Sequence, residues 1–177
     1  KQKLTGRHHK ESTEILVKHF NLSTPVEEAI KPRIARLKSA CINAPNLLMP
    51  GVPEILQAAK QLHLKTAIAS GNEQETLNQL VDCNGIRPYF NAIISSDLVQ
   101  KGKPAPDVYL FAAKALQVKP VECVVFEDAE IGVRAAKAAG MKCVAVPSQY
   151  TIHQDFSQAD MMLRSLAEAN LPDIIKR

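Results

Sequence analysis

The chain of 177 residues is 46% hydrophobic and 23% charged, and it carries a formal net charge of +4 at pH 7. A chain of this length can bury a hydrophobic core within one domain. Its lysines and arginines are scattered, so no basic stripe indicates nucleic-acid binding, and no apolar run approaches the roughly 20 residues that span a bilayer. We therefore expect a cytoplasmic protein that binds neither nucleic acid nor a membrane.

The cysteines show no C-x-x-C spacing, which argues against a zinc site or a redox pair. Two of them lie inside apolar, strand-like runs, which is typical of buried and reduced thiols in a cytosolic protein. The four positions are Cys41, Cys83, Cys123 and Cys143.

Residues 1–45 contain helix signals and no strand signal. A first helix is expected over 11–20, where apolar residues recur on one face. Thr24, Pro25 and Glu27 then form an N-cap, a proline at the first helical position and a capping-box glutamate. The second helix is expected to end near Ser39, and the proline-containing stretch from residue 43 to residue 50 serves as a linker. The pattern predicts a helical unit over 1–45 and a second unit over 46–177.

From residue 46 onward, short apolar runs alternate with helical patterns. Strands that alternate with helices indicate βαβ units, right-handed crossovers and a parallel sheet covered on both faces. The expected fold class is therefore α/β. Strands are expected over 66–69, 92–95, 123–126, 143–146 and 161–163, and helices over 51–62, 72–83, 106–116 and 131–139, with a last helix capped by Ser165 and Glu168.

The stretch from Cys123 to Gly140 is the most informative one. An apolar run typical of a fully buried strand ends in two adjacent acids, Glu127 and Asp128, and a helical pattern follows at once. Ligands of open α/β sheets bind at the carboxyl ends of the strands, so the pair indicates a functional site. Alternatively, Asp128 is only the N-cap of the helix, but this interpretation leaves Glu127 unexplained.

A second polar group follows the expected strand 66–69. Ser70 provides a hydroxyl, Gly71 permits a close approach of the backbone, and Asn72 begins an N-x-x-E helix start. Free backbone N–H groups and the helix dipole at such a point favour a phosphate. An ordinary Ser-Gly-Asn turn remains the alternative.

Lys103 supplies a cation in the loop before the helix at 106–116. It lies between Gly102 and Pro104, so its ammonium group could be held over the same edge of the sheet, whereas Lys101 is expected to be a solvated loop residue. Hard carboxylate oxygens suit Mg²⁺, which typically binds one or two carboxylates together with waters and substrate phosphate. A lysine and a hydroxyl would neutralise and orient a transferring phosphoryl group.

These motifs resemble those of the haloacid dehalogenase superfamily, in the branch of small phosphatases and β-phosphoglucomutase-like enzymes. The matching segments are T-A-I-A-S-G-N, G-K-P-A-P-D and V-V-F-E-D-A-E-I-G, in this order. The resemblance implies a Rossmann-like core with a helical cap, of which 1–45 would be a part. It further implies that Ser70, Gly71 and Asn72 bind the phosphoryl oxygens, that Lys103 neutralises phosphate and nucleophile, and that the acid pair Glu127 and Asp128 binds Mg²⁺. Arg7 resembles a cap residue that contacts the distal part of the substrate.

The chain departs from this family in one motif. No D-x-D occurs in the 177 residues, although the resemblance implies such a motif, with an aspartate nucleophile and an aspartate general acid/base, after a central first strand. We therefore expect the central strand to be missing, the strands at 66–69 and 123–126 not to pair directly, and the chain as given to be inactive.

The resulting functional hypothesis is a Mg²⁺-dependent phosphatase that acts on a small phosphorylated metabolite, such as a sugar phosphate, through an aspartyl-phosphate. A β-phosphoglucomutase-like phosphomutase is one alternative. The other is a catalytically inactive protein that binds a phosphate ligand or a partner. A monomer is expected, and neither substrate identity nor oligomeric state is encoded in a motif of this chain.

Overall fold

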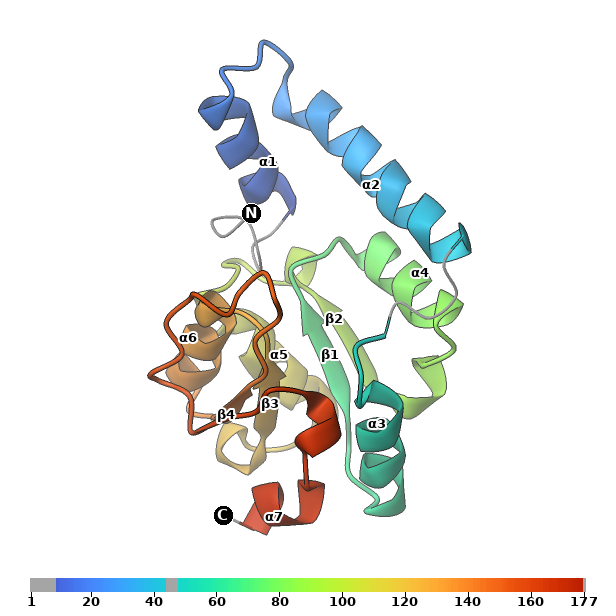
Figure 1. Ribbon diagram of the computed structural model, residues 1–177, viewed down its shortest axis with the longest axis vertical. Helices are drawn as coiled ribbons and strands as arrows, with labels where there is room; N and C mark the ends of the chain where they lie inside the picture. Colours follow the sequence, from blue (N-terminus) through green and yellow to red (C-terminus); the bar gives the residue numbers. More distant parts are fainter. Residues whose placement is uncertain (1–8, 44–47, 177) are drawn as a thin grey trace.

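The computed structural model describes residues 9–43 and 48–176. Its first two helices, α1 (His9–His19) and α2 (Val26–Asn43), pack against each other and stand together above the strands (Figure 1). Pro25 precedes α2 and its carbonyl accepts the first backbone bonds of the helix, so the helix begins at Val26, one residue after the start at Pro25 that the capping pattern predicts. The helix runs past the expected end at Ser39 to Asn43. The division into units 1–45 and 46–177 stays a prediction.

The rest of the described chain alternates between strands and helices, and the expected elements are present except that the last α-helix begins at Leu171 and not after Ser165. The α-helices are α3 (Val52–Gln61), α4 (Gln74–Cys83), α5 (Asp107–Leu116), α6 (Glu130–Ala138) and α7 (Leu171–Lys176). The strands are β1 (Ala67–Ser70), β2 (Ala92–Ser95), β3 (Val124–Glu127), β4 (Lys142–Ala145) and β5 (Met161–Met162).

All strand pairs in the described chain are parallel, which confirms the α/β fold class. β1 pairs with β2, with Ser70 opposite Ser95, and β3 pairs with β4, with Glu127 opposite Ala145. β5 pairs with β4 on the edge that faces away from β3. The carboxyl ends of β1 and β3 therefore lie toward the end of the molecule where α1 and α2 stand (Figure 1).

The described strands form two sheets instead of one. The first has the order β1-β2 and the second the order β3-β4-β5, and no backbone ladder joins β1 to β3. The expectation that these two strands do not pair directly is confirmed for the described residues. Helix α5 contacts both β1 and β2 and also packs against α6, so helices connect the two sheets.

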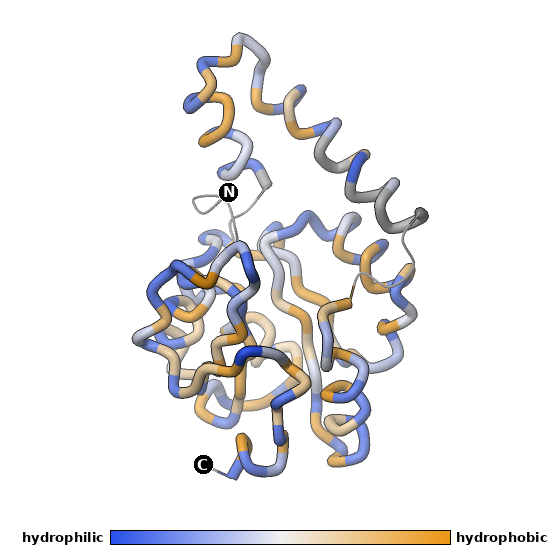
Figure 2. The backbone as a smooth tube through the Cα atoms, in the orientation of Figure 1, coloured by the Kyte–Doolittle hydropathy of each residue, from blue (hydrophilic) through white to orange (hydrophobic). Residues whose placement is uncertain are grey.

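Small and β-branched residues make up most of the core. One cluster gathers buried side chains of α5, α6 and β4, including Val108, Val133 and Cys143, and a smaller one joins Val144 and Val146 to Ile174 of α7. Figure 2 shows the hydrophobic residues along the strands and the inner faces of the helices. This packing holds the strand ends in place.

Three further predicted helix starts differ from the observed ones. Asn72 does not cap α4, because the N-cap residue is Glu73 and the capping acceptor comes from Asp97, whose Oδ2 accepts from Gln74 N at 2.9 Å. Asp128 does not cap α6 either. The cap residue is Ala129, and Gln154 Oε1 accepts from Glu130 N at 2.8 Å.

The third difference concerns Ser165, which begins a 3-10 turn over Leu166–Glu168 instead of the last helix. At α4 and α6 a side chain from a neighbouring segment reaches the free N–H, whereas Ser165 caps its 3-10 turn with its own Oγ, which accepts from Ala167 N at 3.2 Å.

The expectation for the cysteines holds only in part. Cys123 and Cys143 are free, and Cys143 is fully buried in β4. Burial, with Glu127 nearby, raises the pKa of the Cys143 thiol to about 12. Cys83, which lies outside the apolar runs and is exposed on α4, is disulfide-bonded, which differs from the expectation of reduced thiols. The side chain of Cys41 lies outside the described residues.

Within the described ranges, no helix is both long enough and apolar enough to cross a membrane.

Candidate active site

The turn after β1 is stabilised by its own residues and by β2. Ser70 Oγ accepts from the backbone N–H of Asn72 at 3.1 Å, and Ser95 Oγ donates to the carbonyl of Asn72 at 2.7 Å. Gly71 lies half-buried between Ser70 and Asn72. Because Ser70 acts as an acceptor in this turn, its hydroxyl proton remains available to a ligand.

Lys103 lies between the two sheets. The residue is 9% exposed, and its Nζ donates to the carbonyl of Ala69 in β1 at 3.2 Å. The same ammonium group forms a buried ion pair with Glu127 Oε1 at the end of β3. Lys101, two residues earlier, is exposed, as expected of a solvated loop lysine. One buried cation thus links Ala69, the residue before Ser70, to Glu127.

Glu127 is fully engaged by its neighbours. The residue is 8% exposed, and its Oε1 accepts from both Lys103 Nζ and the hydroxyl of Tyr109. Its Oε2 accepts from the backbone N–H of Asp128 at 3.2 Å. The carboxylate lies directly over Gly132 in the first turn of α6, where any Cβ atom would overlap it. Three hydrogen-bond donors, from Lys103, Tyr109 and Asp128, therefore fix the position of the Glu127 carboxylate.

Asp128 differs from its neighbour. It is only partly buried, and no side chain of the described residues donates a hydrogen bond to its carboxylate or pairs with it. Burial raises the pKa of Asp128, the negative charge of Glu127 raises it further, and Lys103 partly opposes both. Folding therefore disfavours the charged form of Asp128, and a bound cation would relieve this cost.

The residues at this edge fit a magnesium ion through Asp128. The described ranges contain no group of three or more His, Cys, Asp or Glu residues placed to hold a metal. Mg²⁺ does not require such a group, because it commonly binds through one or two carboxylates and keeps several waters. Asp128 has carboxylate oxygens to offer, whereas both oxygens of Glu127 already accept hydrogen bonds.

Two residues of the site were not singled out from the sequence. Tyr109 is 5% exposed on α5, and burial together with the nearby charge of Glu127 raises its pKa well above the usual range, so its hydroxyl stays a donor. Gly132 leaves room for the Glu127 carboxylate. A buried tyrosine needs a hydrogen-bond partner, and a glycine inside a helical pattern signals close packing, so both residue types carried a signal. Arg7 lies outside the described residues.

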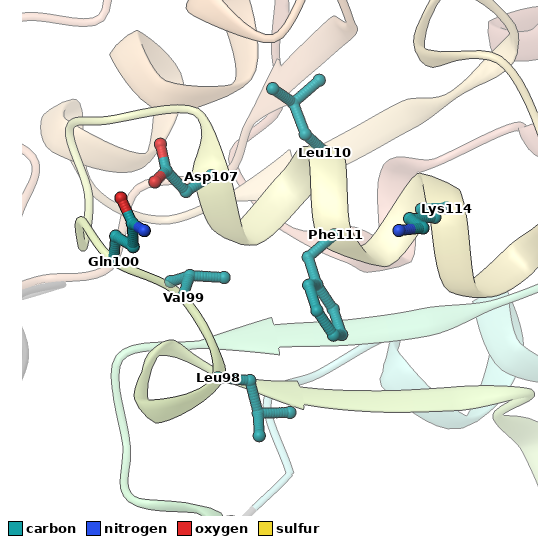
Figure 3. Close-up of a pocket in the computed structure, with 7 residues that line it drawn as sticks. All are labelled: Leu98, Val99, Gln100, Asp107, Leu110, Phe111 and Lys114. Carbon is teal, nitrogen blue, oxygen red and sulfur yellow. The ribbon is translucent and has the colours of Figure 1, made fainter.

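A separate hollow of about 310 Å³ lies beside the loop that follows β2. Figure 3 shows it between this loop and α5, lined mainly by apolar side chains. Leu98, Leu110 and Phe111 are exposed around it. A mainly apolar lining does not suit a phosphate. We therefore place the candidate phosphate site at the polar residues that follow β1 and β3, and not in this hollow.

Comparison with known proteins identifies the family. Residues 5–140 match the model of the haloacid dehalogenase-like hydrolases. The putative phosphatase YhcW of Bacillus subtilis is 43% identical over 122 residues, which are 69% of this chain and 56% of that protein. The chain spans about half the length of the curated relatives it matches.

Solved structures agree with this assignment. The crystal structure of CbbY from Rhodobacter sphaeroides in complex with phosphate has a TM-score of 0.89 and 29% identity, and the match covers 98% of this chain and 80% of that one. A second CbbY structure, of a mutant in complex with xylulose-(1,5)bisphosphate, has a TM-score of 0.86 and 30% identity, over 94% and 77% of the two chains.

A β-phosphoglucomutase from Clostridium difficile shares the fold, with a TM-score of 0.86 at 23% identity over 99% of this chain and 78% of that one. The family inferred from the three sequence motifs is confirmed. The chain belongs to the haloacid dehalogenase-like hydrolases and is similar to their CbbY and β-phosphoglucomutase-like members.

Proposed function

We propose that the protein is a Mg²⁺-dependent phosphoryl-transfer hydrolase that acts on a small phosphorylated metabolite such as a sugar phosphate. The observation that carries this proposal is the position of Lys103. Its ammonium group contacts Ala69, the residue before Ser70, and Glu127, the last residue of β3, at the same time. In this proposal the hydroxyl of Ser70, the ammonium group of Lys103 and the carboxylate of Asp128 act together on one bound phosphate.

Each group has a distinct role in this proposal. Ser70 donates its hydroxyl to a phosphoryl oxygen, and Gly71 lets the substrate approach the backbone closely. Lys103 neutralises negative charge on the phosphoryl group, an effect that is large in a site shielded from water. Asp128 would hold Mg²⁺, which neutralises further charge on the phosphoryl oxygens.

The relatives support a phosphate ester as ligand. YhcW is named a putative phosphatase, and the CbbY structures contain phosphate and a sugar bisphosphate. None of the described residues supplies the aspartate nucleophile of the family motif, so the proposal for this chain covers the groups that bind and neutralise the phosphate. The coding sequence upstream of Lys1 is an independent check, because a D-x-D-x-T motif there would supply that nucleophile.

The test is phosphate release from a panel of sugar monophosphates and bisphosphates, by protein expressed from the complete reading frame, with Mg²⁺ or with EDTA. We expect turnover with Mg²⁺ only. Asp128→Asn should lower it by about two orders of magnitude, the scale seen when one preorganised electrostatic group is removed. The matched control is Asp173→Asn, because Asp173 is exposed on α7.

Equal loss in both variants, or metal-independent turnover, would refute the proposed role of Asp128. Binding of phosphate esters without any turnover would favour the alternative of a ligand-binding protein that does not catalyse a reaction.

A further inference from the structure

The hydroxyl of Tyr109 meets the carboxylate of Glu127 at the atom that also accepts from Lys103. Both donors therefore share Glu127 Oε1. The tyrosine comes from α5, the lysine from the loop that leads into α5, and the glutamate from the end of β3. Three side chains thus meet at one oxygen atom, and the two donors both belong to the α5 segment.

The ring of Tyr109 contacts the same lysine. Lys103 Nζ lies 4.8 Å from the ring centroid, within the range of a cation–π interaction. The tyrosine therefore contacts both members of the buried ion pair, the cation through its ring and the carboxylate through its hydroxyl. A phenylalanine at this position would keep the ring and lose only the second contact.

The residues around Glu127 restrict the orientation of its side chain. Gly132 gives its carboxylate the space to lie over the first turn of α6, and the backbone N–H of Asp128 occupies its second oxygen. With Lys103 and Tyr109 on the first oxygen, Glu127 has no oxygen free of hydrogen bonds. The adjacent Asp128 receives no such contact from a described side chain.

We infer that Tyr109 is a positioning residue, whose hydroxyl holds Glu127 against Lys103 and so leaves Asp128 as the carboxylate that binds the metal. Two adjacent acids thereby acquire different tasks, one to fix the lysine and the other to bind the cation. This assignment rests on the proposed function and deepens it. Without the hydroxyl, Glu127 rotates more freely, and Lys103 loses its fixed position beside the phosphate.

The test compares Tyr109→Phe with Tyr89→Phe. Tyr89 is a matched control, because its ring also lies over a lysine, with Lys60 Nζ at 5.8 Å from its centroid, while no described residue bonds its hydroxyl. Nuclear magnetic resonance of ¹⁵N-labelled lysine reports the exchange of the Lys103 ammonium protons with water, and Lys103→Arg assigns the signal. Exchange should become about tenfold faster in Tyr109→Phe, as expected for the loss of one hydrogen bond to a charged group.

A kinetic readout separates positioning from a structural role. At a temperature where both variants are fully folded by circular dichroism, Tyr109→Phe should lower kcat with little change in KM, because the fixed lysine acts mainly on the transition state. Tyr89→Phe should change neither value. If Lys103 exchange and kcat in Tyr109→Phe match those of the unaltered protein, Tyr109 is a core residue and the inference is wrong.

The two proposals fail separately. If the unaltered protein releases no phosphate from any ester, the proposed function fails, while the proton exchange of Lys103 still decides whether Tyr109 positions the Glu127–Lys103 pair.

Discussion

The turns after β1 and after β3 both lead from a parallel strand into a helix, but they are stabilised differently. The β1 turn contains one local hydrogen bond, from Asn72 N to Ser70 Oγ, and one from Ser95, which lies 23 residues from Asn72 on β2. The β3 turn depends on groups distant in sequence. Glu127 is held by Lys103 and Tyr109, which lie 24 and 18 residues away. A short motif therefore supplies one bond of the first turn, whereas the side chains that bond Glu127 in the second turn both come from a distant segment.

The turns are alike in how their helices are capped. In each case the capping side chain comes from the segment that follows a neighbouring strand, Asp97 after β2 and Gln154 after β4. These distant caps leave the polar residues at the strand ends available to a ligand. Asp97 and Gln154 thus support the two turns of the site without being candidates for substrate contact themselves.

The largest expected effect comes from Lys103→Met, which removes the cation shared by the two turns. It leaves the buried Glu127 without a charged partner, and breaking a buried pair in this way costs about 3–5 kcal/mol. Urea unfolding measures the loss, and hydrogen exchange should show that the amide of Asp128 loses more protection than that of Asn72. This outcome would confirm that the β3 turn depends more on distant contacts.

The control for Lys103→Met is Arg134→Met, which breaks the exposed pair between Arg134 and Glu130 on α6. An i,i+4 surface pair contributes about 0.3–0.5 kcal/mol. Equal losses in the two variants would contradict the conclusion that Glu127 depends on Lys103.

An intermediate effect is expected from Gly132→Ala. The new Cβ atom would overlap the Glu127 carboxylate, which must then move away from Lys103 and Tyr109. Overpacking of this kind costs about 1–3 kcal/mol. Gly102→Ala is the control for unfolding free energy, since its Cβ atom would meet no atom within 4 Å. If Gly132→Ala is as stable as Gly102→Ala, the β3 turn is less constrained than the structure indicates.

The smallest effect is expected when the distant caps are removed one at a time. Asp97→Ala and Gln154→Ala each leave a helix N–H without its acceptor, at a cost of about 1 kcal/mol. The loss should be slightly larger for Asp97, whose charge also interacts favourably with the dipole of α4. Gln158→Ala, an exposed substitution near Gln154, is the control in urea unfolding. A large difference between the two cap variants would show that the turns are not capped alike.

Much of this protein could be predicted from residue patterns alone. Alternating apolar runs and helical periods indicated the strands of a parallel α/β fold, because buried strands and amphipathic helices need those patterns wherever they occur. Ser70, Lys103 and the acid pair were predicted to meet at one edge, because parallel strands bring their carboxyl ends together. The absence of pairing between β1 and β3 was also expected, because the chain lacks the D-x-D motif whose strand the family resemblance implies between them.

The tertiary structure alone decided how the two acids differ. Their adjacency in the sequence gives Glu127 and Asp128 the same neighbours along the chain. Packing of α5 against the strands brings the ammonium of Lys103 and the hydroxyl of Tyr109 to Glu127, and Gln154 from the loop after β4 takes the capping task that the local pattern assigned to Asp128. Hydrogen bonds between distant segments depend on where whole helices pack, and no short sequence pattern encodes that.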